Sequence, residues 1–104
     1  MKQLEQDIVR AILQAAPYVL PGWKLWRQNT GAFKVPESNR FIRFGVNGQA
    51  DITGLTPEGR RVEIEVKRPG GKQSPAQKEF EAMIKANGGI YVLVNSVDDL
   101  RRLK

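Results

Sequence analysis

The segment from Thr56 to Arg60 restricts the fold of this chain more than any other. It reads Thr-Pro-Glu-Gly-Arg. Pro suits the first central position of a type I turn, and Gly suits the left-handed position that follows. This pattern is typical of a three-residue hairpin loop with a bulge at the Gly. The flanking residues 49–55 and 60–67 alternate apolar and polar side chains, so we expect them to form an antiparallel strand pair.

The loop also determines which residues of the two strands face each other. With Thr56 opposite Arg60, Asp51 falls opposite Glu65. Alternation along each strand then predicts two faces. The expected core face holds Ala50, Ile52, Val62, Ile64 and Val66, and the expected solvent face holds Asp51, Thr53, Glu63, Glu65 and Lys67.

Asp51, Glu65 and Lys67 are the candidate catalytic residues on the solvent face. Directly opposite Cβ atoms lie about 4.5–5.5 Å apart, and two carboxylates at about 5 Å repel by roughly 3 kcal/mol at an effective dielectric near 20. A divalent cation between them would convert this repulsion into a site with oxygen ligands. Lys67 can meet the charge of a phosphate or orient a water. The competing interpretation is an ordinary solvated strand face whose acids Lys67 partly neutralises.

Glu5 is a further candidate metal ligand. On a helical wheel it lies within the apolar face, between Ile8, Val9 and Ile12. A buried carboxylate needs a partner or a metal. The alternative is that Glu5 is an exposed acid in the first helical turn, where the helix dipole favours negative charge. Asp7 lies on the polar face, and we expect it to be solvated.

The segment Ser74-Pro75-Ala76-Gln77 predicts a helix start, with Ser74 as the N-cap and Gln77 completing a capping box. Because this helix begins soon after Lys67, Gln77 could also reach the candidate site. By contrast, Gly70-Gly71-Lys72 is not a phosphate-binding P-loop, since Gln follows the Lys and the upstream Gly is missing. We therefore expect no nucleotide cofactor.

The remaining pattern predicts a single layered α/β domain over residues 1–104, in the order αβββαβα. The expected helices cover residues 2–16 (stopped by Pro17), 74–87 (with an apolar stripe of Ala76, Phe80, Met83 and Ile84) and 96–104. Besides the central pair, the expected strands cover residues 23–29, 41–44 and 90–94, with a loop or irregular hairpin over 30–39.

Composition indicates a nucleic-acid partner and limits the possible chemistry. Lys and Arg total 17 against 11 Asp and Glu, which gives a net charge of +6. Such a surface favours a polyanion, unless the charge serves solubility alone. The chain has no His and no Cys, so hydrolysis would depend on carboxylates, Lys and a hard metal such as Mg²⁺.

Basic and aromatic residues interleave over residues 23–43, as in nucleic-acid surfaces that stack bases. For Trp23 and Trp26 we favour the alternative, in which both Trp side chains fill the core and only the Lys and Arg side chains face water. The expected phosphate-binding residues are Arg27, Arg43, Arg68 and Lys72, the last three because they flank the acidic strands.

Nothing in the sequence indicates a membrane partner. No apolar stretch approaches the roughly 18–20 residues of a membrane span. Residues 1–7 are polar and mixed in charge, unlike a secretory signal. We expect a cytoplasmic location.

Taken together, these residues resemble the VRR-NUC family of the PD-(D/E)XK nuclease superfamily over nearly the whole chain. The ordered series of similar segments is more specific than Glu-x-Lys alone. It looks like the short stand-alone form found in phages, so the cytoplasm would be that of a bacterium or a phage-infected host. The similarity includes Glu5 with Ile8 and Ile12, and residues 26–31, 43–45, 48–54, 63–71, 74–77 and 88–89.

The resemblance implies a restriction-endonuclease-like core, αβββαβ with a central mixed sheet flanked by helices, and Mg²⁺- or Mn²⁺-dependent phosphodiester cleavage. Short members are similar to Holliday-junction resolvases, so branched DNA and a homodimer are implied. Ala50 stands where the superfamily name has Pro, although other members also have small residues there. Asp51 and Glu65 match the family's metal carboxylates, Lys67 its catalytic Lys, Gln77 its motif Gln and Glu5 the acid on its first helix.

Three functions stay open at this point. The first is a structure-selective DNA endonuclease that acts as a dimer. The second is a catalytically idle DNA-binding module, against which the intact Asp51, Glu65 and Lys67 argue. The third is a nuclease of similar core that acts on flaps, duplex ends or RNA. Phosphate contacts carry no base information, so the sequence does not separate the first from the third.

Overall fold

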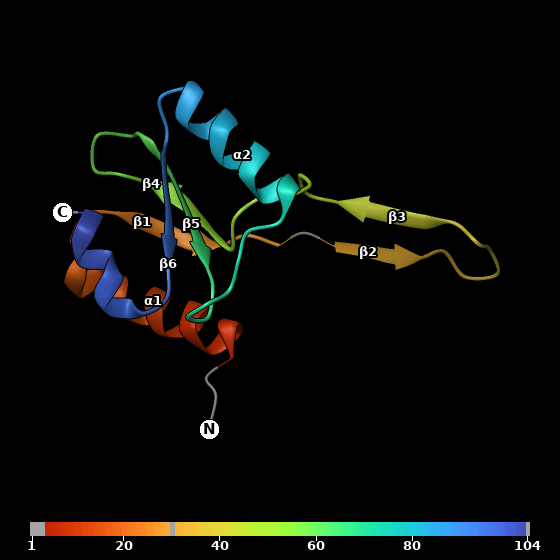
Figure 1. Ribbon diagram of the computed structural model, residues 1–104, viewed down its shortest axis with the longest axis horizontal. Helices are drawn as coiled ribbons and strands as arrows, with labels where there is room; N and C mark the ends of the chain where they lie inside the picture. The colour runs from red at the N-terminus through yellow and green to blue at the C-terminus, as the bar shows by residue number, and fades with distance from the viewer. Residues whose placement is uncertain (1–3, 30, 104) are drawn as a thin grey trace.

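A four-stranded mixed sheet forms the centre of the protein (Figure 1). The structure is a computed structural model that describes residues 4–29 and 31–103, without the side chains at positions 31–33 and 41–44. The strand order is β1-β4-β5-β6, antiparallel except for the parallel pair β5 and β6. The sheet strands are β1 (Lys24–Arg27), β4 (Ile52–Leu55), β5 (Arg61–Val66) and β6 (Ile90–Val94).

The hairpin predicted between β4 and β5 is confirmed. The Thr56 N–H donates to the Arg60 carbonyl at 2.9 Å, and the Gly59 N–H donates to the Thr56 carbonyl at 2.9 Å. Gly59 has a φ of 84°, the left-handed conformation that the turn requires. Thr53 lies opposite Glu63, as the turn predicted. However, β4 begins at Ile52 instead of residue 49, so Asp51 precedes the strand.

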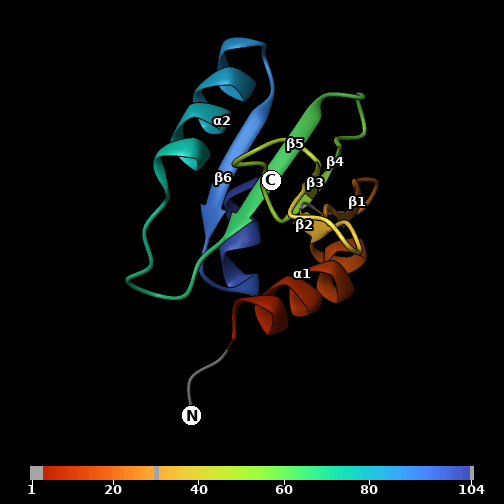
Figure 2. The same cartoon turned by 90° about the vertical axis from the view of Figure 1, so that its right-hand side faces the viewer.

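Helices cover both faces of the sheet (Figure 2). α1 (Glu5–Val19) and the 3-10 helix η1 (Val97–Leu103) lie on one face, and α2 (Pro75–Ala86) lies on the other. α1 and η1 enclose the main core with the sheet, because apolar side chains from all three meet there. The buried residues of this core are Ile8, Val9, Ile12, Leu20, Ile52, Val62, Ile64, Val66, Val94 and Leu100.

The prediction that the first helix stops at Pro17 is wrong, since α1 continues to Val19. Leu20 is fully buried, and its N–H donates to the Ala16 carbonyl at 2.8 Å. Pro inside a helix costs about 3 kcal/mol. Packing of Leu20 into the core offsets that local cost and holds the last turn. Residues 2 and 3 of the predicted helix lie outside the described residues.

The predicted solvent face of the central strands is also wrong, because most of its residues are buried, on the side of the sheet that carries α2. Glu63 and Glu65 are 0% and 2% exposed, and Thr53 is buried. A second apolar cluster lies on this side of the sheet, where α2 packs against β6, and consists of Ala50, Phe80, Ile84 and Tyr91. Ala50 therefore does not belong to the main core as predicted. It precedes β4, where strand alternation no longer applies.

The predicted helix over residues 74–87 is confirmed, with Ser74 as the N-cap and Asn87 as the C-cap of α2. Phe80 and Ile84 are buried, whereas Met83, expected in the same stripe, is exposed. The strand predicted over residues 90–94 is found as β6, and the helix predicted over residues 96–104 is found as the 3-10 helix η1. Among the described residues, no helix combines the length and apolar content needed to cross a bilayer.

The segment between β1 and β4 forms a separate antiparallel hairpin, which extends away from the central sheet (Figure 1). Its strands are β2 (Gly31–Lys34) and β3 (Phe41–Phe44). The sequence predicted β3 and left residues 30–39 as a loop or an irregular hairpin. The backbone of β2 pairs with that of β3, with Ala32 opposite Arg43, so this segment is a hairpin and not a loop.

Candidate active site

Asp51 lies where the chain enters β4, and two interactions fix its position. The Gln28 N–H donates to the Asp51 carbonyl at 2.8 Å, which continues the pairing of β1 with β4. The Asp51 Oδ2 accepts a hydrogen bond from the Val66 N–H at 2.8 Å. The carboxylate thus takes the place of a backbone partner at the end of β5. This hydrogen bond holds Asp51 beside Glu65.

Glu65 is the most electrostatically perturbed carboxylate among the described residues. Its Oε2 accepts a hydrogen bond from the Gln77 Nε2 at 3.1 Å and lies 3.9 Å from the Lys67 Nζ. Its Oε1 is buried and has no hydrogen-bond partner among those residues. The pKa of Glu65 is raised to about 8, mainly by burial and also by the neighbouring Asp51 carboxylate, while Lys67 opposes both effects.

The capping box of α2 orients the Gln77 side chain toward Glu65. The Gln77 Oε1 accepts from the Ser74 N–H at 2.8 Å, while the Ser74 Oγ accepts from the Gln77 N–H at 3.2 Å. With its oxygen used in this way, the Gln77 amide presents its Nε2 to Glu65. The cap and the contact with the site, which the sequence suggested separately, therefore depend on one side chain.

Gly48 allows α2 to approach the segment that leads to Asp51. Its φ is 81°, and a Cβ at this position would overlap the backbone carbonyl of Ala76. A left-handed conformation combined with such a close approach requires Gly. This contact places the start of α2 against the segment before Asp51.

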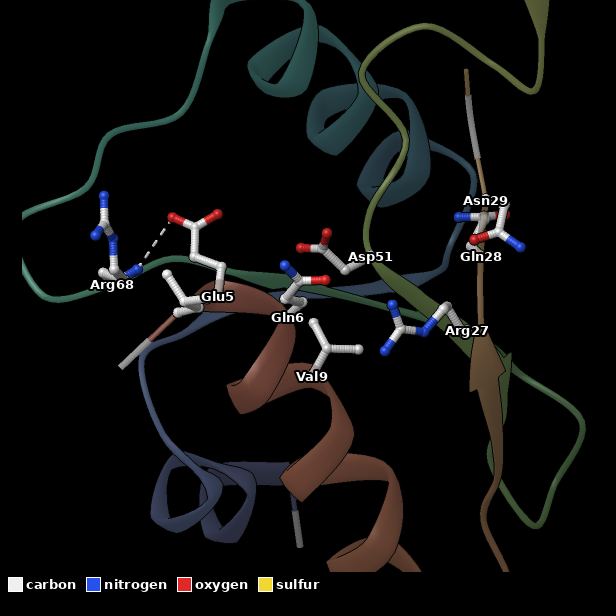
Figure 3. A pocket seen from close by; sticks show the side chains of 9 residues that line it. Glu5, Gln6, Val9, Arg27, Gln28, Asn29, Asp51 and Arg68 are labelled. Carbon is white, nitrogen blue, oxygen red and sulfur yellow. Dashed lines mark hydrogen bonds between the residues drawn. The ribbon is translucent and has the colours of Figure 1, made fainter. Parts of the chain in front are cut away.

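Glu5 reaches the same region from α1. Its Oε2 accepts a hydrogen bond from the Arg68 N–H at 3.3 Å. Glu5 and Asp51 line a cavity of about 530 Å³, and Figure 3 shows both carboxylates there. The charge of Glu5 also contributes to the raised pKa of Glu65. In the described part of the chain, however, no three acidic residues converge into a compact group that could enclose a metal ion.

The donor set fits a hard divalent cation. Mg²⁺ prefers carboxylate oxygens and keeps several waters, so one or two protein carboxylates suffice. Asp51 and Glu65 supply two neighbouring carboxylates, and one buried oxygen of Glu65 has no partner within residues 4–29 and 31–103 as described. A cation at this point would remove the repulsion between the two acids and satisfy that oxygen.

The predicted phosphate-binding residues differ in their relation to this cavity. Arg27 and Arg68 line it (Figure 3). Lys72 is exposed on the loop between β5 and α2 but does not line the cavity. The side chain of Arg43 lies outside the described residues.

Sequence reasoning missed Gln28 and Glu63. The Gln28 Nε2 donates to the Ala50 carbonyl at 3.1 Å and to the Glu63 Oε1 at 3.4 Å. The Arg61 guanidinium also contacts the Glu63 Oε1, at 3.2 Å. Gln28 therefore links buried Glu63 to the segment that carries Asp51. No periodic pattern signals Gln28, and the burial of Glu63 depends on tertiary contacts that the strand sequence does not encode.

Asn95 is a third residue that the sequence did not single out. Its Nδ2 donates to the Lys67 carbonyl at 2.9 Å, and its N–H donates to the Asp99 Oδ2 at 2.7 Å. Asn95 thereby ties the backbone of Lys67 to η1.

Comparison with known proteins identifies no relative, since neither a family model nor a curated protein matches the chain.

Proposed function

We propose that this protein is a metal-dependent nuclease that hydrolyses phosphodiester bonds in branched DNA. The observation that carries the proposal is the Asp51–Glu65 pair, two adjacent carboxylates with Lys67 beside them and a buried Glu65 oxygen that has no partner among the described residues. A protein that used this region only for structure would gain little from such repulsion, because buried like charges destabilise a fold.

Asp51 and Glu65 would hold Mg²⁺ or Mn²⁺, and Glu5 would contribute from the cavity wall. The bound metal would polarise the phosphate and lower the pKa of a water. Lys67 lies close enough to the pair to meet the negative charge that develops on the phosphate. Gln77 and Asn95 are positioning residues, because they act on Glu65 and on the Lys67 backbone.

Charge supports DNA as the substrate. The chain carries a net charge of +6, and Arg27 and Arg68 line the same cavity as Asp51. Lys72, which lies outside that cavity, would add a phosphate contact, as would Arg43, whose side chain is not among the described ones. A four-stranded mixed sheet with helices on both faces is a generic α/β arrangement that a PD-(D/E)XK core would share, although five strands separate α1 from α2 in the described residues, more than the expected αβββαβ order has. The resemblance to VRR-NUC nucleases supports a resolvase-like homodimer, because symmetric cuts in two strands require two sites.

The test is cleavage of labelled linear, flapped and four-way DNA, and of RNA, with Mg²⁺, Mn²⁺ or EDTA. We expect metal-dependent cleavage that is strongest on the branched DNA and is lost in Asp51→Asn. Glu58→Gln is the matched control, since it alters an exposed acid in the β4–β5 turn. Tight DNA binding without cleavage in either metal would overturn the proposal and favour the idle binding module. Preference for RNA or duplex ends would correct the substrate.

A further inference from the structure

α2 packs against β6 and leaves the other side of its sheet face uncovered. We define the open sheet face as Lys24, Trp26, Leu55 and Arg61. Leu25 packs toward the main core, so its neighbours Lys24 and Trp26 lie on the opposite face. The register places Lys24 opposite Leu55 and Leu55 opposite Arg61. All four residues are exposed.

Trp26 contradicts the expectation that both Trp residues fill the core. Trp23 packs against the main core, as expected, but Trp26 is 52% exposed. Leu55 beside it is 41% exposed. Trp is a large amphipathic side chain that commonly marks a contact surface when it is left exposed. Trp26 therefore requires an explanation other than core packing.

The open sheet face lies next to the candidate active site. Trp26 is opposite Thr53, and Gln28, two residues further on, bonds to Asp51. One step of two residues spans about 7 Å and neighbouring strands lie about 4.8 Å apart, so the Cα atoms of Trp26 and Asp51 are about 8 Å apart. Trp26, Glu63 and Glu65 share one face of the sheet by register.

The charges around Trp26 suit a nucleic-acid strand. Lys24 precedes it by two residues on the same face, and Arg61 lies two strands away. The Arg61 guanidinium contacts buried Glu63 at 3.2 Å, yet its side chain remains 54% exposed. An aromatic ring with basic residues around it is the arrangement with which proteins bind unpaired strands, because bases stack on the ring while phosphates meet the cations.

We propose that Trp26 stacks on an unpaired base next to the scissile phosphate, with Lys24 and Arg61 at neighbouring phosphates. This inference rests on the proposed nuclease function and specifies its substrate. A base inside a continuous duplex already stacks on both sides, so it cannot stack on Trp26 without being extruded. Branched or flapped DNA offers unpaired bases without that cost. Trp26 thereby becomes the residue that selects for unpaired nucleotides.

The test uses Asp51→Asn protein in Ca²⁺, so that binding is measured without cleavage. Its substrates are a flapped DNA and a fully paired duplex of equal length. Trp26→Ala should weaken binding to the flap by roughly 5- to 150-fold, which corresponds to about 1–3 kcal/mol per stacked base. Binding to the duplex should change little. Trp26→Phe should restore part of the loss, since it keeps an aromatic face.

Tyr18→Ala is the matched control, because Tyr18 is an 85% exposed aromatic residue on α1, on the other side of the sheet. It should leave both affinities unchanged. In a Trp23→Phe background, the fluorescence of Trp26 should be quenched by the flap and not by the duplex. Melting temperatures of all variants establish that they fold.

Equal losses of affinity for flap and duplex in Trp26→Ala would overturn the inference. So would a dimer that Trp26→Ala dissociates without DNA, because the open sheet face would then be a contact between protomers. Either result leaves the nuclease proposal standing if wild-type protein still cleaves. Conversely, quenching of Trp26 by the flap without cleavage in any metal would retain the stacking site and overturn the nuclease.

Discussion

The Gln77 Nε2 donates to the Glu65 Oε2 at 3.1 Å, while the other end of the same amide caps α2. This contact couples the start of a helix to the orientation of a buried carboxylate. Gln77 satisfies only one oxygen of Glu65, and the buried Oε1 has no hydrogen-bond partner in the described part of the chain. The two roles of Gln77 can be separated by comparing the loss of its whole side chain with the loss of the Ser74 hydroxyl alone.

Gln77→Ala removes both contacts, whereas Ser74→Ala removes only the hydrogen bond from the Gln77 N–H to the Ser74 hydroxyl. Both variants should lose about 1 kcal/mol of stability from the weakened cap. Only Gln77→Ala should also lose metal affinity, by roughly 10- to 100-fold, as is common when a residue that orients a ligand is removed. Thermal melting with and without Mn²⁺ measures both effects. Equal metal affinity in the two variants would show that Gln77 serves the helix alone.

Asp51→Asn, Glu65→Gln and Lys67→Ala should each reduce cleavage by at least roughly 10²–10³-fold, the usual cost of losing one electrostatic contact to a transition state. Asp51→Asn should keep or slightly raise the stability of the metal-free protein. An Asn side chain retains an oxygen for the Val66 N–H and removes the repulsion with Glu65.

Asp51→Ala tests that reasoning by leaving the Val66 N–H without its acceptor, which costs about 1–3 kcal/mol. Its melting temperature should therefore fall below that of Asp51→Asn. Cleavage and melting are to be measured on the same preparations. Near-wild-type cleavage by any one of the three principal variants would remove that residue from the catalytic set.

The pH dependence of stability should report on Glu65. Its pKa is raised to about 8 in the folded protein from an ordinary value of 4.5. The folded state therefore binds the proton more tightly than the unfolded chain does between these values. This contribution to stability is complete below about pH 4.5 and is lost as pH rises toward 8. Glu65→Gln should flatten this part of the profile in melts between pH 5 and 8.

Mg²⁺ should oppose the loss of stability at higher pH, because the metal and the proton compete for the Glu65 carboxylate. The melting-temperature increase caused by saturating Mg²⁺ should grow from pH 5 to 8 in wild-type protein and stay small in Glu65→Gln. An identical slope in both proteins without metal would assign the pH dependence to other groups.

Glu5→Gln should reduce metal-dependent cleavage more than Asp7→Asn does. Glu5 lines the cavity beside Asp51 and accepts from the Arg68 N–H, whereas Asp7 pairs with Arg10 at 3.5 Å. A metal titration of both variants makes the comparison. Equal and small effects would mean that Glu5 is only a helix-terminus acid.

Local chemistry made the central hairpin predictable, and tertiary packing set the limits of that prediction. Pro57 and Gly59 encode the turn, so the opposition of Thr53 and Glu63 followed from a few residues. The burial of Glu63 and the extension of α1 past Pro17 did not follow. Both depend on contacts with elements distant in sequence, which override local preference. The exposure of Trp26 was missed for the same reason, since composition does not reveal which part of a sheet a helix leaves open.

The salt dependence of DNA binding should identify which basic side chains of the protein contact DNA phosphates. Arg68 lines the cavity beside Asp51, whereas Lys72 lies further along the loop. Each phosphate contact contributes roughly 0.9 to the slope of log affinity against log salt. Arg68→Ala should therefore lower the slope by about 0.9 per protomer. It retains the backbone N–H that bonds Glu5, so metal affinity should hold.

The double variant Arg68→Ala/Lys72→Ala should lower the slope by up to about 2 per protomer. Arg101→Ala is the control, because this exposed Arg on η1 pairs with Asp98 at 2.8 Å. The measurement is a salt titration by Asp51→Asn protein in Ca²⁺, on two branched DNAs of equal shape and different sequence. The loss should be the same on both, since phosphate contacts do not read bases. A slope that Arg68→Ala leaves unchanged would show that the cavity arginine faces solvent in the complex, and would place the DNA path over another basic surface.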